Sequence, residues 1–331
     1  MKWLHRISQD VLIAALALGI FIHHQFFSYG NALAPQVYAS ETVAPQDELA
    51  APKEASLANP LSLSGLTYQE LHPQDTVTLL GQYANADGTL FTSTYKIETN
   101  VSAGKVTFYA ADVLLSDITQ FQTAYAKGAY GQEVEEKPLT ILQENNGILG
   151  LSGDNWGLSD GGIIVRNGTW YREKPDGHDL CVLYRDGRME TLFSDAVDIN
   201  ILKNSDVWQT FSFGPALLDN DGNPLSSFHA PEYIRQRHPR AVVGYIAPGH
   251  YVWIAIDGRE DGYSVGVTLP EEAQLCSDLG CKSAYNLDGG KTATLMNQNS
   301  FFNKPCEGMA EKGGREMCDI LFLRDTTTAA K

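Results

Sequence analysis

Two aspartates that each follow a short apolar stretch are the residues of this sequence best suited to acid–base or nucleophilic chemistry. Asp288 stands between the stretch Ser283–Leu287 and two glycines, and Asp257 ends the apolar run Tyr251–Ile256. A carboxylate pair can supply a general acid together with a nucleophile or base, provided that the local environment separates the two pKa values. The alternative is that an aspartate before a glycine only stabilises a turn, and it stays open for both residues.

The segment between the two aspartates predicts how they meet. A helix is expected to begin at Thr268, where Glu271 completes a capping box, and to end at Gly280. Strand, helix and strand together predict a βαβ crossover, in which the two strands are parallel and neighbours in one sheet. Both aspartates then lie at the same sheet edge, with their carboxyl groups roughly 5 to 10 Å apart. This range covers the carboxylate separations of retaining and inverting glycosidases.

The remaining sequence predicts an α+β (mixed α/β) fold: a large β-rich domain with a mixed sheet and few helices. Hairpin turns are expected at Ala86-Asp87-Gly88, Asn167-Gly168 and Asp186-Gly187. Strands are expected at residues 76–83, 92–98, 105–111, 162–166, 169–172, 181–184 and 210–213. A helix is expected from Ser116 to about Ala126, because its apolar residues recur with helical spacing.

The N-terminal segment predicts export. Basic residues precede the uncharged apolar run Val11–Ile22, which has the length of a signal-peptide core. Residues 1–34 are therefore expected to be a signal peptide or an uncleaved membrane anchor, and the Ala-, Pro- and acid-rich residues 35–60 a disordered spacer. Residues 61–331 remain as a single domain. We expect an extracellular or cell-surface protein that contacts a membrane only through its N-terminal segment.

The net charge limits the expected binding partners, and the cysteine content limits the expected disulfides. The formal net charge of −16 disfavours long-range attraction of an anionic polymer, so nucleic acid is not an expected partner. Five cysteines in an exported protein leave one unpaired. The preferred disulfide joins Cys306 to Cys318 across a polar loop, and a second, weaker candidate joins Cys276 to Cys281. Cys181, in an apolar run, is expected to be a buried thiol.

Several short motifs occur in order between about residues 105 and 323. They are Gly153-Asp154-Asn155-Trp156-Gly157, Val165-Arg166-Asn167-Gly168, Phe213-Gly214-Pro215-Ala216-Leu217, Pro239-Arg240, Asp257-Gly258-Arg259, Gly266-x-Thr268-Leu269 and Asn286-Leu287-Asp288-Gly289-Gly290. Together they resemble the phosphodiester glycosidase family. The resemblance implies hydrolysis of an α-linked sugar that is joined through its anomeric phosphate to a second alcohol.

The resemblance also implies roles for residues of these motifs. Asp288 is the expected catalytic carboxylate, with Asp257 or Asp154 as its partner. Guanidinium groups match a phosphate through two parallel hydrogen bonds, and Arg240 and Arg259 are the arginines expected to do so. Backbone N–H groups and amide side chains complete the expected substrate contacts. They belong to Gly289, Gly290, Asn286 and Asn155, and Lys291 and Thr292 are the other expected substrate-binding residues.

The sequence departs from the family pattern close to the expected chemistry. Lys291 and Thr292 stand where many members have a third glycine and a hydroxyl residue. Lys291 either binds phosphate directly or obstructs a backbone-lined pocket. Ala241 and Ser152 replace a common threonine and a common asparagine. The leading hypothesis is an exported or surface-tethered hydrolase of glycosyl phosphodiester bonds in an envelope or extracellular glycan. The alternatives are a non-catalytic glycan- or sugar-phosphate-binding protein and an ordinary glycosidase.

Metal binding and the histidines are weaker signals. Oxygen ligands such as those of Asp154, Asp257 and Asp288 suit Ca²⁺, so this ion stays open as a ligand, and no cofactor is otherwise expected. His229 and His238 lie outside the motifs and are expected to be surface or loop residues. The identity of the sugar and the oligomeric state are left open.

Overall fold

The computed structural model describes residues 62–63, 66–131, 133–155, 157 and 160–327. The expected signal peptide or anchor (1–34) and the expected spacer (35–60) lie outside these residues. Within the described part of the chain, no helix is long and apolar enough to cross a membrane.

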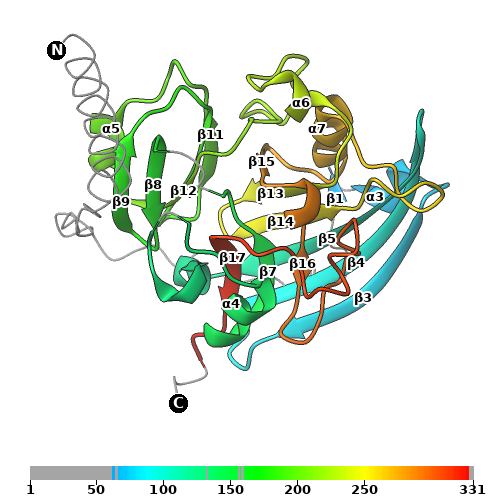
Figure 1. Cartoon of the computed structure of the whole chain (residues 1–331), viewed down its shortest axis with the longest axis horizontal. Helices are drawn as coiled ribbons and strands as arrows, with labels where there is room; N and C mark the ends of the chain where they lie inside the picture. Colours follow the sequence, from blue (N-terminus) through cyan, green and yellow to red (C-terminus); the bar gives the residue numbers. More distant parts are fainter. Residues whose placement is uncertain (1–61, 64–65, 132, 156, 158–159, 328–331) are drawn as a thin grey trace, which may run out of the picture. The chain divides into compact units, whose positions relative to one another are not determined.

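A six-stranded antiparallel sheet carries the core of the fold on both of its faces (Figure 1). In spatial order its strands are β15 (Ser283–Leu287), β13 (Arg240–Ala247), β14 (His250–Ile256), β5 (Gly104–Leu115), β4 (Leu90–Val101) and β3 (Thr76–Ala84). The predicted turn at Ala86-Asp87-Gly88 joins β3 to β4. β5 is buried continuously from Val106 to its end, because both faces of the sheet are covered.

Each face of this sheet packs against different elements. On one face, Phe108 and Ile254 pack with helix α7 (Leu269–Asp278). On the other face, Trp253 and Leu287 pack with side chains from the smaller sheets. Successive side chains of a strand point to opposite faces, so two-sided burial explains why β14 is apolar without alternation. Full burial of each large apolar side chain stabilises the fold by about 1.5–3 kcal/mol.

The smaller sheets and short helices complete the described part of the chain. A four-stranded sheet has the order β16 (Leu295–Met296), β7 (Gly147–Ser152), β17 (Asp319–Arg324) and β6 (Phe121–Tyr125). A three-stranded sheet has the order β11 (Met189–Leu192), β10 (Leu180–Tyr184) and β12 (Val207–Phe211). Two strand pairs are β8 (Gly162–Arg166) with β9 (Thr169–Lys174), and β1 (Ser62–Leu63) with β2 (Leu66–Thr67). The helical segments are α3 (Tyr68–Leu71), α4 (Pro138–Glu144), α5 (Ile199–Lys203), α6 (Glu232–Arg235), η1 (Ile118–Gln120), η2 (Ala126–Gly128) and η4 (Gly290–Thr292). The predicted β-rich α+β class is confirmed.

The two strands that carry the aspartates are parallel but not neighbours. β13 lies between β14 and β15 and pairs antiparallel with both, so that Ala241 faces Ala255 on one side and Leu287 on the other. The predicted adjacency is therefore wrong, and the pairings of this sheet are antiparallel rather than mixed. The reason is that β13, which forms a hairpin with β14, occupies the position next to β14 where β15 was expected. Two strand spacings, about 10 Å, separate Asp257 from Asp288, and both stand at the same sheet edge.

The helix expected over 116–126 is wrong. The chain forms only the single turn η1, where the side chain of Asp117 accepts the N–H of Thr119 at 2.9 Å, and then continues as β6. β6 pairs with β17 and buries Phe121 in the core. Phe, Thr and Tyr suit a strand, and pairing with β17 decides what apolar spacing alone left undecided.

Local signals at helix and hairpin ends are confirmed. Glu271 accepts hydrogen bonds from the backbone N–H (2.8 Å) and the hydroxyl (2.9 Å) of Thr268 at the start of α7. Gly280 adopts φ +85 just after its end. The turn Asn167-Gly168 joins β8 to β9, and Asp186-Gly187 joins β10 to β11.

All five cysteines are free thiols in this structure, so neither predicted disulfide is present. Cys318 precedes β17 and is buried next to Asp319, whereas Cys306 lies beside the guanidinium of Arg259. The loop between them therefore places the two thiols in different surroundings. The other three thiols are also buried: Cys181, as expected, Cys276 and Cys281.

Candidate functional site

The end of β15 presents Asp288 as a half-buried carboxylate. Its backbone N–H donates to the carbonyl of Gly153, 3.1 Å away, which ties this strand end to the segment after β7. Burial raises the pKa of Asp288 to about 6, although the Thr292 hydroxyl and the Arg315 guanidinium lower it in part, and the nearby Asp154 raises it further. A solvent-accessible carboxylate that titrates near neutral pH is suited to acid–base or nucleophilic chemistry.

The two glycines after Asp288 let the chain turn against Pro239. A Cβ on Gly289 would lie 2.6 Å from the carbonyl oxygen of Pro239, closer than real Cβ atoms approach. Gly290 adopts φ +63 and donates its N–H to the same oxygen at 2.9 Å. The hydroxyl of Thr292 donates to the carbonyl of Gly289 at 2.5 Å. The Gly290 N–H is thus engaged within the protein, not presented to an anion as predicted, and Thr292 stabilises the turn.

Asp257 anchors a loop. One carboxylate oxygen accepts Asn303 Nδ2 at 2.9 Å, and the other accepts the Tyr263 hydroxyl at 2.7 Å and the Lys304 N–H at 3.0 Å. Burial raises the pKa of Asp257 to about 6, while these hydrogen bonds lower it in part. Only 2% of the residue is exposed. These contacts favour a structural role for Asp257 over the predicted catalytic one.

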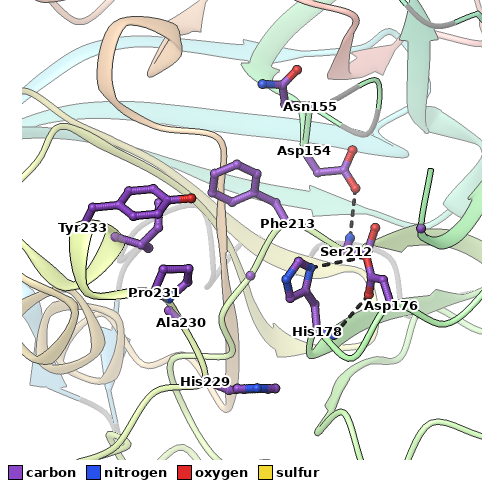
Figure 2. Close-up of a pocket in the computed structure, with 13 residues that line it drawn as sticks. Asp154, Asn155, Asp176, His178, Ser212, Phe213, His229, Ala230, Pro231 and Tyr233 are labelled. Carbon is purple, nitrogen blue, oxygen red and sulfur yellow. Dashed lines mark hydrogen bonds and ion pairs between the residues drawn. The ribbon is translucent and has the colours of Figure 1, made fainter. Parts of the chain in front are cut away.

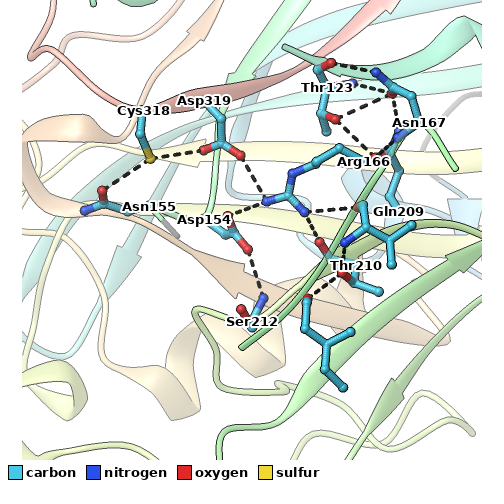
Figure 3. A network of polar contacts seen from close by, with 12 residues as sticks. Thr123, Asp154, Asn155, Arg166, Asn167, Gln209, Thr210, Ser212, Cys318 and Asp319 are labelled. Carbon is cyan, nitrogen blue, oxygen red and sulfur yellow. Dashed lines mark hydrogen bonds and ion pairs between the residues drawn. The ribbon is translucent and has the colours of Figure 1, made fainter. Parts of the chain in front are cut away.

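A buried ion-pair network fixes the orientation of Asp154 (Figure 3). Arg166 Nη2 donates to Asp154 Oδ1 at 2.6 Å and to Asp319 Oδ2 at 3.0 Å. The other oxygen of Asp154 accepts the N–H of Ser212 at 2.9 Å. Burial, and then the charge of Asp154, raise the pKa of Asp319 to about 7. The network therefore holds Asp154 in one place between the ends of β7 and β12.

A cavity of about 200 Å³ opens beside Asp154 and Asn155 (Figure 2). Its other walls are the turn after β9, the segment Ser212–Gly214 after β12, and the stretch His229–Ile234 that enters α6. Asn155 adopts φ +52, a conformation that asparagine tolerates better than most residues. Two residues of the Gly153–Gly157 motif, Asp154 and Asn155, thus line one cavity.

His178 is a titratable group on the wall of this cavity that the sequence reasoning missed. Its Nδ1 lies 3.3 Å from Asp176 Oδ2, and this hydrogen bond raises the pKa of His178 above its usual value. Phe213 and the exposed Tyr233 also line the cavity (Figure 2). Polar groups between aromatic rings suit a sugar. The available sequence signal was Asp-Gly-His in a turn, and His229, expected only at the surface, lines the cavity as well.

Two predicted substrate-binding side chains are buried and engaged within the protein. Arg240 is 3% exposed and lies 3.4 Å from Glu272 of α7, and its Nη2 donates to the backbone carbonyls of Ile234 and Gln236. Burial lowers the pKa of Arg240 and raises that of Glu272 to about 7. Asn286 is 1% exposed and donates its amide to the carbonyl of Gly214, 2.7 Å away. Both stabilise the walls of the site.

Arg259 and Lys291 are the predicted phosphate-binding cations that the structure leaves at the surface. Arg259 Nη1 lies 2.8 Å from Glu307 Oε1, and Lys291 Nζ lies 2.7 Å from Glu307 Oε2. Arg259 Nη2 also lies 3.1 Å from Nδ1 of His238, which was expected to be a plain surface histidine. The Arg259 guanidinium lies close to Gly290, two residues after Asp288, and Lys291 follows that glycine in the chain.

The predicted Ca²⁺ ligands do not converge. Asp154 bonds to Arg166 and Ser212, and Asp257 bonds to its loop. Among the residues that the structure describes, no three His, Cys, Asp or Glu side chains are grouped so that they could hold a metal ion.

Fold and site together define a β-rich α+β protein in which the half-buried Asp288 is tied through its backbone to Gly153, the residue before Asp154 in the wall of a polar, partly aromatic cavity. The family model described as phosphodiester glycosidase matches residues 141–322, more than half of the chain, including Asp154, Asp257 and Asp288. The chain belongs to the phosphodiester glycosidase family.

Individual relatives are distant. The chain is 25% identical over 205 residues to an uncharacterised SPbeta prophage-derived protein, YomE, of Bacillus subtilis (strain 168), and the match covers 60% of this chain but only 31% of that protein. This chain is similar in structure to the zebrafish N-acetylglucosamine-1-phosphodiester alpha-N-acetylglucosaminidase catalytic domain, which is auto-inhibited by a pro-peptide. The match has a TM-score of 0.59 and 17% sequence identity, and it covers 76% of this chain and 88% of the zebrafish domain. A hypothetical protein from Synechocystis is also similar in structure, with a TM-score of 0.53 and 12% sequence identity over 70% of this chain and 62% of that protein. At these identities the structural likeness concerns the fold alone.

Proposed function

We propose that this protein is a hydrolase that cleaves α-glycosyl-1-phosphodiester bonds, with Asp288 as its catalytic carboxylate. The observation that carries the proposal is the setting of Asp288. It lies half-buried on a glycine turn with a pKa of about 6, near enough to Asp154 at the cavity for the charge of Asp154 to raise the pKa of Asp288. Family membership supports the class of reaction.

In this reaction the bond between the anomeric carbon and the phosphate oxygen breaks, and water supplies the new oxygen on that carbon. The products are a free sugar and a phosphomonoester. Above about pH 6 Asp288 is ionised and stabilises the positive charge that develops at the sugar ring. The departing phosphate is a good leaving group, so strong acid assistance is not required. The positive charge of Arg315, which lowers the pKa of Asp288 in part, would also attract the phosphate.

We place the sugar in the cavity beside Asp154. The amide of Asn155 and the imidazole of His178 supply hydrogen bonds there, and Tyr233 supplies an aromatic face. Asp154 itself, held by Arg166, orients the turn that carries Asn155. A cavity of about 200 Å³ matches one monosaccharide better than an oligosaccharide.

The test is release of free sugar from an α-glycosyl-1-phosphodiester by the full chain and by two variants. Asp288→Asn should abolish release while the protein stays folded, and Asp221→Asn, at an exposed aspartate in a turn, should behave like the wild type. Sugar release by Asp288→Asn at the wild-type rate would refute the assignment. Equal rates on the phosphodiester and on a simple aryl glycoside would instead support an ordinary glycosidase.

The second candidate is a non-catalytic protein that binds a glycan or sugar phosphate. The observation that favours it is that the Gly290 N–H and the Arg259 and Lys291 cations are all engaged within the protein. This candidate predicts saturable binding of a sugar 1-phosphate to the wild type with no turnover of the diester.

We also propose that the protein acts outside the cytoplasm, on an envelope or extracellular glycan. The support is the apolar run Val11–Ile22 and the spacer-like composition of residues 35–60. Protease added to intact cells that express the full chain should digest the domain. Complete protection, with digestion only after lysis, would contradict export.

A further inference from the structure

One carboxylate bridges two cations at the glycine turn. Glu307 places one oxygen 2.8 Å from Arg259 Nη1 and the other 2.7 Å from Lys291 Nζ. All three side chains are partly exposed, at 41% for Glu307, 34% for Arg259 and 39% for Lys291. Solvent, and any dissolved anion, therefore reaches the place that the Glu307 carboxylate occupies.

The backbone around this cluster is constrained on both sides of the ion pair. Arg259 adopts φ +60 and Glu307 adopts φ +55, in the left-handed region that residues with long side chains seldom occupy. Such strain persists only where surrounding structure maintains it, and it concentrates at binding sites. Both partners of one ion pair share this strain, which separates the cluster from an incidental surface pair.

The guanidinium of Arg259 is held in place by more than Glu307. Its Nη2 lies 3.1 Å from His238 Nδ1, and His238 Nε2 lies 2.7 Å from the carbonyl oxygen of Tyr233, which lines the cavity. A Cβ on Gly290 would come within 3.2 Å of Nη2, so the absence of a side chain there makes room for the arginine. The cation is thus set between the cavity wall and the turn that follows Asp288.

A neighbouring ion pair provides the contrast. Glu260 lies 2.6 Å from Lys304, with similar exposures of 42% and 48%. It joins one acid to one base, and its carboxylate bridges no second cation in the described contacts. The difference from this pair lies in the number of cations that converge on one acid. Glu98 also contacts two lysines, Lys96 and Lys105, but through a single oxygen and without the left-handed backbone of Arg259 and Glu307.

We propose that Arg259 and Lys291 form a binding site for the phosphate group of a mono- or diester, and that Glu307 occupies this site as an internal competitor until the ligand displaces it. Two carboxylate oxygens on two cations resemble two non-bridging phosphate oxygens on the same cations. The inference rests on the proposed function for its biological ligand, and its test needs no catalysis.

The expected affinity for phosphate depends on the cost of displacing the Glu307 carboxylate. A phosphate that enters the site must break both ion pairs of Glu307, and removing that negative charge also removes a repulsion. Exposed ion pairs are individually weak. Loss of the Glu307 charge should therefore tighten phosphate binding by about three- to tenfold.

The experiment is calorimetric titration of inorganic phosphate and of dimethyl phosphate into the full chain at constant ionic strength and pH 7.5. Glu307→Gln should bind both probes about three- to tenfold more tightly than the wild type. Glu260→Gln, the matched control, should bind like the wild type. Adding Lys291→Met to Glu307→Gln should reverse the gain. Glu307→Gly, which also relieves the left-handed strain, is a second variant with the same expectation as Glu307→Gln if the latter unfolds.

Three results would overturn the proposal: equal affinity of Glu307→Gln and wild type, an equal gain in Glu260→Gln, or a gain that survives Lys291→Met. Because binding is the readout, absence of sugar release would count against the proposed hydrolase only. Intact hydrolysis with unchanged phosphate binding in Glu307→Gln would count against the internal competitor only.

Discussion

Asp288→Asn is expected to change activity and stability in opposite directions. The carboxylate is the proposed catalytic group, and its loss should lower kcat/KM for a glycosyl phosphodiester by at least about 100-fold. The same carboxylate is unfavourable for the folded state when it is ionised, because burial raises its pKa from 3.8 to about 6. The variant should therefore be nearly inactive and yet more stable than the wild type at alkaline pH.

The size and pH range of the stability gain follow from the pKa. A change from 3.8 to about 6 corresponds to about 3 kcal/mol against the ionised form. Solvent reaches this half-buried group, so about 1–2 kcal/mol is the expected gain. Because the folded pKa lies above the unfolded one, the contribution of Asp288 to the stability of the wild type falls as pH rises from about 4 to above 6. The gain in Asp288→Asn should be complete at pH 8 and vanish near pH 4.

Urea unfolding at pH 4 and pH 8, together with sugar release at pH 7.5, checks this prediction. Asp221→Asn controls for the change of one surface charge and should leave both activity and stability within error. A variant that keeps more than a tenth of wild-type kcat/KM would refute the catalytic role. A variant that is less stable than the wild type at pH 8 would refute the account of the raised pKa.

Three further predictions concern the walls of the site. Arg166→Met leaves its two aspartate partners buried without a cation and should lower the free energy of unfolding in urea by about 3–5 kcal/mol; the exposed Arg188→Met should lower it by less than about 1 kcal/mol, and equal losses would contradict the network's role. Gly289→Ala forces a methyl group against a carbonyl oxygen and should lower thermal stability by about 2 kcal/mol or more, whereas Gly81→Ala, with no atom within 4 Å of the added methyl, should be nearly neutral. His178→Gln should raise KM for the phosphodiester about tenfold with little change in kcat, as expected for one lost sugar contact; an unchanged KM would place the sugar elsewhere.

Short-range signals in the sequence were reliable in this protein. The capping contact between Thr268 and Glu271, the stop at Gly280 and the hairpin turns all involve groups a few residues apart, so the local chain alone determines them. The placement of Asp288 before two glycines was equally local. Its position at a strand end before a glycine turn follows from a stretch of about ten residues.

Residues that depend on partners distant in sequence were less predictable. Arg240 carries a side chain suited to phosphate, yet Glu272, 32 positions later, and the carbonyls before α6 hold it beneath the sheet edge. Asp257 was equivalent to Asp288 in sequence, but Asn303 and Lys304 come from a loop that no local pattern predicts. The chemistry of the two aspartates diverged because their distant neighbours differ.

By itself the sequence determined the family, the β-rich class, the capped helix and the carboxylate on its glycine turn. Only the tertiary structure decided that β13 separates the two aspartate strands, that Asp154 and His178 share a cavity, and that Glu307 lies on Arg259 and Lys291. The physical reason is the separation in sequence between the groups that determine each feature. Caps and turns depend on hydrogen bonds within a few residues, whereas strand order, burial and ion pairing depend on which remote segments fill the space around each side chain.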